Sequence, residues 1–291
     1  MDQYQITNVE SIPLIGTIIH ELGHLLLGYP DLYDYTAATI PCSASPYGCQ
    51  AKSSGVGKHA LMGSGDSVNG QRTPAPISLY LKEVSGWATI TDLLATDTLL
   101  ANLPSTGNVG YRIYKPSFDA EYFLVENRGP GDKWAQYVPD NGIMIWHIDE
   151  SQPNNDDERR LRSSHYEASL EQSDGLFNLE SLGTENNRGD SGDLFDLARP
   201  TFNTAGTVNS RWWSGSSSGL SLEVLNNPGS SVSVQFSPNA QNILPLALDN
   251  NELEFTSGGD ASWLPQTSTT HDGSDAAESG DIADNQFMTI N

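Results

Sequence analysis

Two histidines four positions apart have the clearest capacity for chemistry: His20 and His24 stand in the sequence HELGH. Residues i and i+4 of an α-helix lie on one face, so both imidazoles can reach a single metal ion. Neutral imidazole suits zinc, which binds histidine nitrogen at about 2.0–2.1 Å. The spacing therefore predicts a zinc site. The alternative is a histidine pair that only packs within the core.

Glu21 follows His20 directly and lies about 100° further around the helix. At that position its carboxylate can reach a metal-bound water rather than the metal itself. Zinc lowers the pKa of such a water towards ~7, and a glutamate can take its proton. The activated water would attack a carbonyl carbon, and the glutamate would then protonate the leaving amine. Glu21 is thus the predicted catalytic residue.

A third ligand is expected just after the helix, because a catalytic zinc usually keeps three protein ligands and one open position. Gly28 lets the chain turn back, and Asp31 follows three residues later. Asp31 is the first choice and Asp34 the second, although either carboxylate could instead cap a loop. Tyr29 and Tyr33 could donate a hydrogen bond to a transition-state oxyanion, but packing is the simpler role.

The element that must position the histidines is a helix, predicted over residues 11–27. Ser11 can cap it, Pro13 suits its first turn, and Gly28 with Pro30 ends it. Its apolar residues cover most of the circumference, so we expect a buried helix.

Further along the chain the pattern changes from helical to strand-like. A second helix is expected over residues 76–85. Strands are expected where aromatic and β-branched residues stand between turn signals. These predicted strands are residues 111–114, 121–126, 142–148, 220–225 and 231–236.

Residues 20–34 resemble the zinc-binding signature of the M6 family of secreted metallopeptidases, the immune inhibitor A type. Those peptidases resemble metzincins with an aspartate in place of the third histidine. Residues 61–65 are similar to the family's turn around a methionine beneath the metal, here Met62. Residues 76–87 resemble the helix that follows the turn. Further similar segments, within a resemblance that covers about residues 15–236, are residues 122–128, 142–149, 170–180 and 189–195.

The resemblance implies an α+β fold and three regions. Residues 1–95 would form the C-terminal part of a metzincin-like zinc peptidase domain, with active-site helix, Met-turn and following helix. Residues 96–240 would form a β-rich, sandwich-like region. Residues 241–291 would be an acidic tail or the truncated start of an extracellular β-sandwich module. The implied function is a secreted zinc endopeptidase that acts on proteins or peptides.

Two departures from the family pattern affect this expectation. Gly28 comes one position later than the usual glycine, and one extra residue rotates a helix end by about 100°. The turn must absorb that rotation, or another acid must coordinate, with Glu126 as a distant fallback. The family also has a sheet before the zinc helix, whose edge strand holds the substrate. We therefore expect a chain truncated at its N-terminus, without its signal peptide, truncated also at its C-terminus, and weakly active or inactive alone.

The charge excludes several kinds of partner. Acidic residues outnumber basic ones 37 to 14, giving a net charge of −23. Duplex nucleic acid and anionic membranes both favour basic proteins, and no apolar run reaches the ~20 residues that cross a bilayer. The sequence does not indicate which oligomeric state the chain adopts. Some acids could bind calcium rather than only solvate the surface. The candidate ligands are Asp174, Asn178, Glu180, Asp190, Asp193 and Asp196.

Weaker signals concern two cysteines and two further histidines. Cys42 and Cys49 are expected to form a disulfide if the protein is extracellular; two free thiols are the alternative. His59 and His147 are expected to be structural. The competing functional hypothesis is an inactive surface adhesion protein that retains a peptidase-like domain. Retention of Glu21 beside both histidines favours the peptidase.

Overall fold

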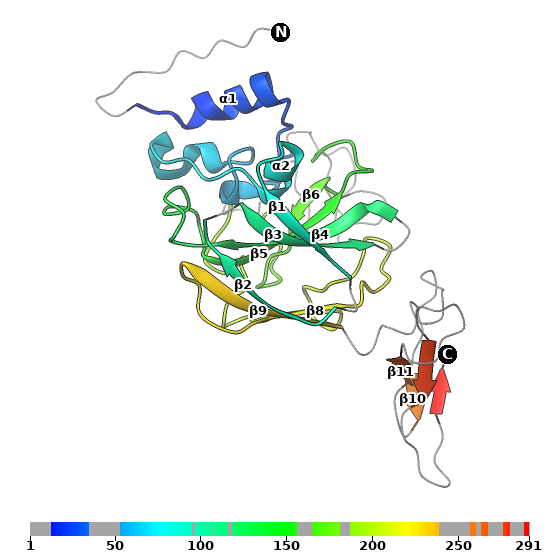
Figure 1. The fold of residues 1–291 in the computed structure, drawn as a ribbon. Coiled ribbons are helices and arrows are strands. Elements are labelled where there is room, and N and C mark those ends of the chain that lie inside the picture. Colours follow the sequence, from blue (N-terminus) through cyan, green and yellow to red (C-terminus); the bar gives the residue numbers. More distant parts are fainter. Residues whose placement is uncertain are drawn as a thin grey trace.

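The computed structural model describes residues 13–34, 53–94, 97–106, 108–115, 118–155, 165–180 and 187–238, together with four short strands after residue 256. These residues form a mixed α and β fold, which consists mostly of strands in two larger sheets (Figure 1).

The first sheet has five strands in the order β1-β3-β4-β5-β6. Strands β1 and β3 are parallel, and the other neighbours are antiparallel. All eight residues of β5 are buried, because this inner strand is covered on both faces. The strands are β1 (Thr89–Leu93), β3 (Val109–Lys115), β4 (Phe118–Arg128), β5 (Gly142–Asp149) and β6 (Ala168–Leu170).

The second sheet has four antiparallel strands in the order β2-β9-β8-β7. Buried and half-buried residues alternate along β9, so one face of this sheet points into a core. That core joins the two sheets: Phe123 and Ile145 of the first contact the same apolar cluster as Leu222 and Val234 of the second. The strands are β2 (Leu99–Pro104), β7 (Thr201–Phe202), β8 (Leu220–Val224) and β9 (Ser231–Pro238).

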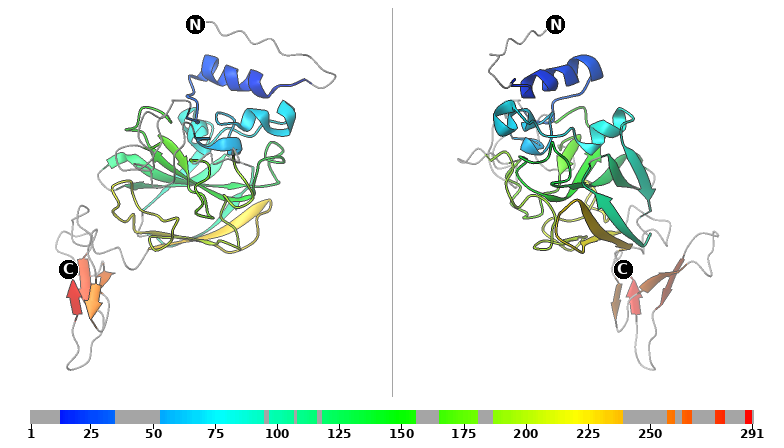
Figure 2. Two further views of the ribbon diagram at one scale, coloured as in Figure 1. Left: turned by 180° about the vertical axis from the view of Figure 1, so that it is seen from behind. Right: turned by 60° about the vertical axis from the view of Figure 1, so that its left-hand side comes forward.

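The helices lie on the other face of the five-stranded sheet, as two opposite views of the chain agree (Figures 1 and 2). They are α1 (Gly16–Leu27), α2 (Leu79–Val84) and the 3-10 segments η2 (Gly57–His59) and η3 (Gly65–Gln71). A second apolar core lies between these helices and the sheet, with Met62, Leu79 and Trp146 among its buried members. The sheet thus supports the helical layer that carries the histidines.

Four short strands complete the described chain and form two two-stranded antiparallel sheets. They are β10 (Ser257–Gly259), β11 (Trp263–Gln266), β12 (Ala276–Ser279) and β13 (Met288–Ile290). Within the described part of the chain, no helix combines the length and apolar character that crossing a membrane requires.

All five strands expected from the sequence are confirmed, as β3, β4, β5, β8 and β9. The second helix is confirmed but shorter than expected: it starts at Leu79, where the Ser78 hydroxyl accepts a hydrogen bond from the Leu81 N–H. The first helix begins at Gly16, after Pro13, and it ends at Gly28 as expected. Ser11 lies outside the described residues.

The expectation of a fully buried first helix is wrong. Leu25 and Leu26 are 75% and 70% exposed, and Ile18 and Leu22 are partly exposed. Only the opposite face of α1 is covered, where it packs on η3 and on the chain around Met62. Apolar periodicity predicts the width of an apolar face, but it does not indicate whether another element of the fold covers that face.

Candidate metal centre

Small residues let helix α1 approach the segment beneath it. Gly16 lies so close to the carbonyl of Asp66 in η3 that no Cβ would fit between them. A Cβ on Gly23 would lie 2.9 Å from the sulfur of Met62, which is fully buried. The face of α1 that carries His20 and His24 is therefore fixed tightly against the Met62 segment.

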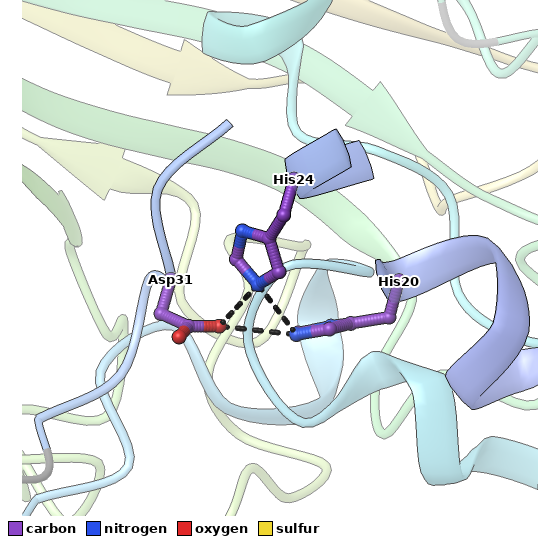
Figure 3. Close-up of side chains that lie close together, drawn as sticks. All are labelled: His20, His24 and Asp31. Carbon is purple, nitrogen blue, oxygen red and sulfur yellow. Dashed lines mark hydrogen bonds and ion pairs between the residues drawn. The ribbon is translucent and has the colours of Figure 1, made fainter. Parts of the chain in front are cut away.

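The two histidines and Asp31 converge on one point (Figure 3). The His20 Nε2 atom lies 3.0 Å from Asp31 Oδ1, and the His24 Nε2 atom lies 3.2 Å from the same oxygen. The two Nε2 atoms are themselves 3.2 Å apart. Three atoms with ligating capacity thus form a nearly equilateral triangle, as the HELGH spacing and the third-ligand expectation required.

The partners of the Nδ1 atoms define the protonation of both rings. His20 Nδ1 lies 3.0 Å from the Leu61 carbonyl oxygen, and His24 Nδ1 lies 2.6 Å from the Tyr29 carbonyl oxygen. Carbonyl oxygens only accept hydrogen bonds, so each Nδ1 carries the proton and donates it. In the neutral rings, both Nε2 lone pairs then face each other and a carboxylate oxygen. A metal ion or a proton among the three atoms would relieve the repulsion between them.

The donor set fits a zinc ion. Bonds of about 2.1 Å in a tetrahedral site separate ligand atoms by roughly 3.4 Å, close to the 3.0–3.2 Å of the triangle. Two imidazoles that donate their other nitrogen to backbone carbonyls are the usual support for histidine ligands. Three protein ligands would leave one position for water or substrate, as catalytic zinc sites do.

The pKa values of His20 and Asp31 shift in opposite directions, as in an ion pair. Burial lowers the pKa of His20, but hydrogen bonds to Asp31 and to the Leu61 carbonyl outweigh it, so the net shift is upward. Burial raises the pKa of Asp31, but its hydrogen bond with His20 and the charge of His24 outweigh that effect, and the net shift is downward. Tyr33 also hydrogen-bonds the Asp31 carboxylate, and its ring stacks against His20 with centroids 6.4 Å apart.

Glu21 is half-buried on α1 and lies outside the triangle. Its carboxylate forms no hydrogen bond or ion pair with the residues that the structure describes. A carboxylate next to the histidines that is not engaged by the protein is chemically able to accept and return a proton.

The choice between the two aspartates is decided by the turn after the helix. Gly28 adopts φ +69°, a left-handed conformation that favours glycine, and the Tyr29 N–H then donates to the Gly23 carbonyl. This path brings Asp31 to the histidines, while Asp34 is buried elsewhere with its own interactions. The turn therefore compensates for the rotation that the extra residue before Gly28 introduces.

The fallback ligand Glu126 does not reach the cluster, and that alternative is wrong. Glu126 is buried in β4, where one oxygen accepts from Arg128, from the Trp146 indole and from the Leu79 N–H. His59 and His147 do not join the cluster either. His59 pairs with Asp193 at 2.8 Å. His147 lies between Glu121 and Glu171.

Two groups that orient the histidines, the carbonyls of Leu61 and Tyr29, could not be predicted from the sequence. Every residue has such a carbonyl, so no side-chain pattern could have identified them. Met62 was identified, and it lies fully buried against Gly23, between the two histidines along the helix. Cys42 and Cys49 lie outside the described residues, so their expected disulfide stays a prediction.

Comparison of the chain with protein-family models, with curated proteins and with solved structures gives no match.

Proposed function

We propose that this chain belongs to a secreted zinc-dependent endopeptidase, in which His20, His24 and Asp31 hold the metal. The observation that carries the proposal is the convergence of two Nε2 atoms and one carboxylate oxygen within 3.2 Å, with both Nδ1 protons directed at backbone carbonyls. The resemblance of residues 20–34 to the M6 signature supports the same conclusion.

The chain's own residues would supply three things to the reaction. Zinc, when bound, would provide the Lewis acidity that activates water and polarises a carbonyl. His20, His24 and Asp31 hold their ligating atoms in place through the rigid helix and turn. Glu21 would accept a proton from the attacking water and return it to the leaving amine. Substrates would be proteins or peptides, since peptide-bond hydrolysis is the chemistry that this arrangement suits.

Zinc binding of matched variants tests the metal site. We expect the wild-type chain to bind one equivalent of zinc, measured by calorimetry on metal-free protein and by elemental analysis. His24→Ala and Asp31→Asn should weaken zinc binding by more than ~100-fold, beyond the ~10–100-fold that loss of a supporting residue costs. Asp34→Asn is the control and should bind zinc like the wild type. A wild-type chain without stoichiometric zinc would reject the proposal.

Glu21→Gln separates catalysis from metal binding. This variant should keep zinc but lose cleavage of casein or of fluorogenic peptides, because an amide cannot take up the proton. If the variant hydrolyses these substrates as fast as the wild type, Glu21 is not the general base. A chain that binds zinc but cleaves nothing in any form would favour the alternative, a surface binding protein that keeps a peptidase-like domain.

A further inference from the structure

A second group of possible ligands lies on the loops around β6 and β7, apart from the histidine cluster. One carboxylate oxygen from each of Asp174, Asp190 and Asp193 lies within 4.8 Å of one from each of the others. Acidic groups often gather at a surface without a ligand. Here the hydrogen bonds and the burial of individual oxygens provide further evidence.

Each of the three carboxylates uses one oxygen to bind the protein. Asp174 Oδ1 accepts from the Leu176 N–H at 2.9 Å. Asp190 Oδ2 accepts from the side-chain amides of Asn178 and Asn187 at 2.9 and 2.6 Å. Asp193 Oδ2 receives the His59 imidazole and the Asp190 N–H, both at 2.8 Å. These bonds fix the carboxylates, and they leave Asp174 Oδ2, Asp190 Oδ1 and Asp193 Oδ1 for another partner.

Two oxygens of this group are buried without a partner. The Asp193 side chain is 0% exposed, and its Oδ1 atom accepts no hydrogen bond within the described structure. The Oδ1 atom of Asn178, whose amide nitrogen donates to Asp190, is likewise buried and unsatisfied. An unsatisfied buried polar atom destabilises the fold, so native proteins rarely leave one without a ligand, ion or water.

The oxygens lie close to the backbone at Gly192. A Cβ placed on this glycine would lie 3.2 Å from Asp174 Oδ2, 3.4 Å from Asp190 Oδ1 and 3.5 Å from Arg199 Nη1. Within the described ranges, no lysine or arginine forms an ion pair with the three carboxylates. The exposed Arg199 guanidinium lies near Gly192, and His59 pairs with Asp193. Burial and the charges of Asp193 and Asp190 raise the pKa of Asp174, and the Leu176 hydrogen bond and the Arg199 charge offset only part of this rise.

We propose that Asp174, Asn178, Asp190 and Asp193 form a calcium site. All the available donors are carboxylate or amide oxygens, which hard cations prefer, and no nitrogen or sulfur ligand is present among them. Calcium binds oxygen at about 2.3–2.6 Å, so ligands on opposite sides of the ion lie about 5 Å apart. The three oxygens lie within 4.8 Å of one another, close enough to share one such ion. Magnesium requires a tighter octahedron.

Of the six candidate oxygen ligands in the sequence, the structure brings Asp174, Asp190 and Asp193 together, and Asn178 is hydrogen-bonded to Asp190. Glu180 accepts a hydrogen bond from the Gln172 amide instead. Asp196 accepts from the backbone N–H groups of Ala198 and Arg199, where it closes a turn. Neither residue belongs to the cluster. Sequence spacing alone could not separate these roles, because the four ligands come from two loops.

Residues 187–193, which include two of the proposed calcium ligands, also contact the chain segment that precedes Met62. The Lys58 N–H donates to the Arg188 carbonyl at 2.7 Å, and the Ser54 hydroxyl donates to the Asn187 carbonyl at 2.9 Å. The fully buried His59–Asp193 pair makes a third connection. An ion that fixes residues 187–193 would therefore stabilise residues 53–59 as well, whether or not zinc is bound.

Calcium binding to the whole chain tests the proposal. Calorimetric titration of calcium-free protein should show one site, and calcium should raise the melting temperature more than magnesium does. Asp174→Asn should weaken calcium binding at least tenfold, since it removes one charged ligand and keeps the acceptor for Leu176. Asp196→Asn is the control and should bind within twofold of the wild type. Calcium should also slow amide exchange at Lys58.

These measurements test the calcium site independently of the zinc site. The calcium effects should persist in His24→Ala, so failure of the zinc site leaves them intact. Absence of a calcium-dependent shift in melting temperature would overturn the proposal. Equal effects of magnesium and calcium, or equal loss of binding in Asp174→Asn and Asp196→Asn, would also overturn it.

Discussion

The sulfur of Met62 packs directly against Gly23 of α1, and it occupies the place that a side chain at residue 23 would need. Gly23 immediately precedes His24 and stands three residues after His20. The methionine therefore supports the helix between its two histidines. The next residue back, Leu61, provides the carbonyl that orients His20, so one short segment sets both the position of the helix and the orientation of a ligand.

Gly23→Ala tests this contact. Replacing a mid-helix glycine by alanine alone would stabilise the helix by up to ~1 kcal/mol. Here the new methyl group would lie 2.9 Å from the Met62 sulfur, and overpacking of a buried site costs about 1–3 kcal/mol. We expect a net loss of about 1 kcal/mol in chemical denaturation, together with weaker zinc binding. Leu25→Ala, at a 75% exposed position, should change stability by less than ~0.5 kcal/mol. A more stable Gly23→Ala protein would contradict the packing described.

Tyr33→Phe tests the support of the proposed third ligand. Tyr33 hydrogen-bonds the Asp31 carboxylate, and its ring stacks against His20. Phenylalanine keeps the stacking and removes only the hydroxyl, so we expect zinc affinity to fall by ~10-fold, the lower end of the range for supporting residues. Stability of the metal-free chain should change little. Tyr137→Phe, at a half-exposed position, is the matched control. Unchanged zinc affinity in Tyr33→Phe would show that Asp31 is oriented by other contacts.

Local patterns in the sequence were sufficient for some features of the fold and the site. The HELGH spacing placed His20 and His24 on one helical face, and Gly28 ended the helix because it can adopt a left-handed conformation. Strand β5 was evident as a continuous apolar segment between turn signals. Each of these features depends on residues that are close together in the sequence, so local chain geometry is sufficient to predict it.

Other features depend on contacts that no local pattern contains. Strand β2 pairs with β9, more than 100 residues away in sequence, and it was not predicted. The exposed face of α1 was expected to be buried, because apolar periodicity does not say what lies opposite. The choice of Asp31 over Asp34 depended on the path of the chain after Gly28. All three were decided by the three-dimensional course of the backbone.

His147 is held in β5 by two acids, in agreement with the structural role expected for it. Its Nε2 atom lies 3.1 Å from Glu121, and its Nδ1 atom lies 3.2 Å from Glu171. The indole of Trp213 stacks on the ring with centroids 4.7 Å apart. Lys115 is a further partner of Glu121, at 2.6 Å. Both nitrogens face carboxylates, an arrangement that favours the doubly protonated, cationic form of the ring.

This arrangement makes part of the stability depend on pH. Burial lowers the pKa of His147, but its hydrogen bonds to Glu121 and Glu171 outweigh burial, so the folded-state pKa is raised above 6.5. The ion pairs therefore contribute fully below pH ~6.5, and the contribution is lost as pH rises through the raised pKa. His147→Gln, which carries no charge, should lower the free energy of unfolding at pH 6 by about 3 kcal/mol, the cost of breaking a buried pair. Urea denaturation from pH 6 to 10 should show this difference shrinking, whereas Thr201→Ala, at an exposed position, should show a constant one. A difference that grows with pH would mean that the folded state holds His147 as a neutral ring, with its pKa below 6.5.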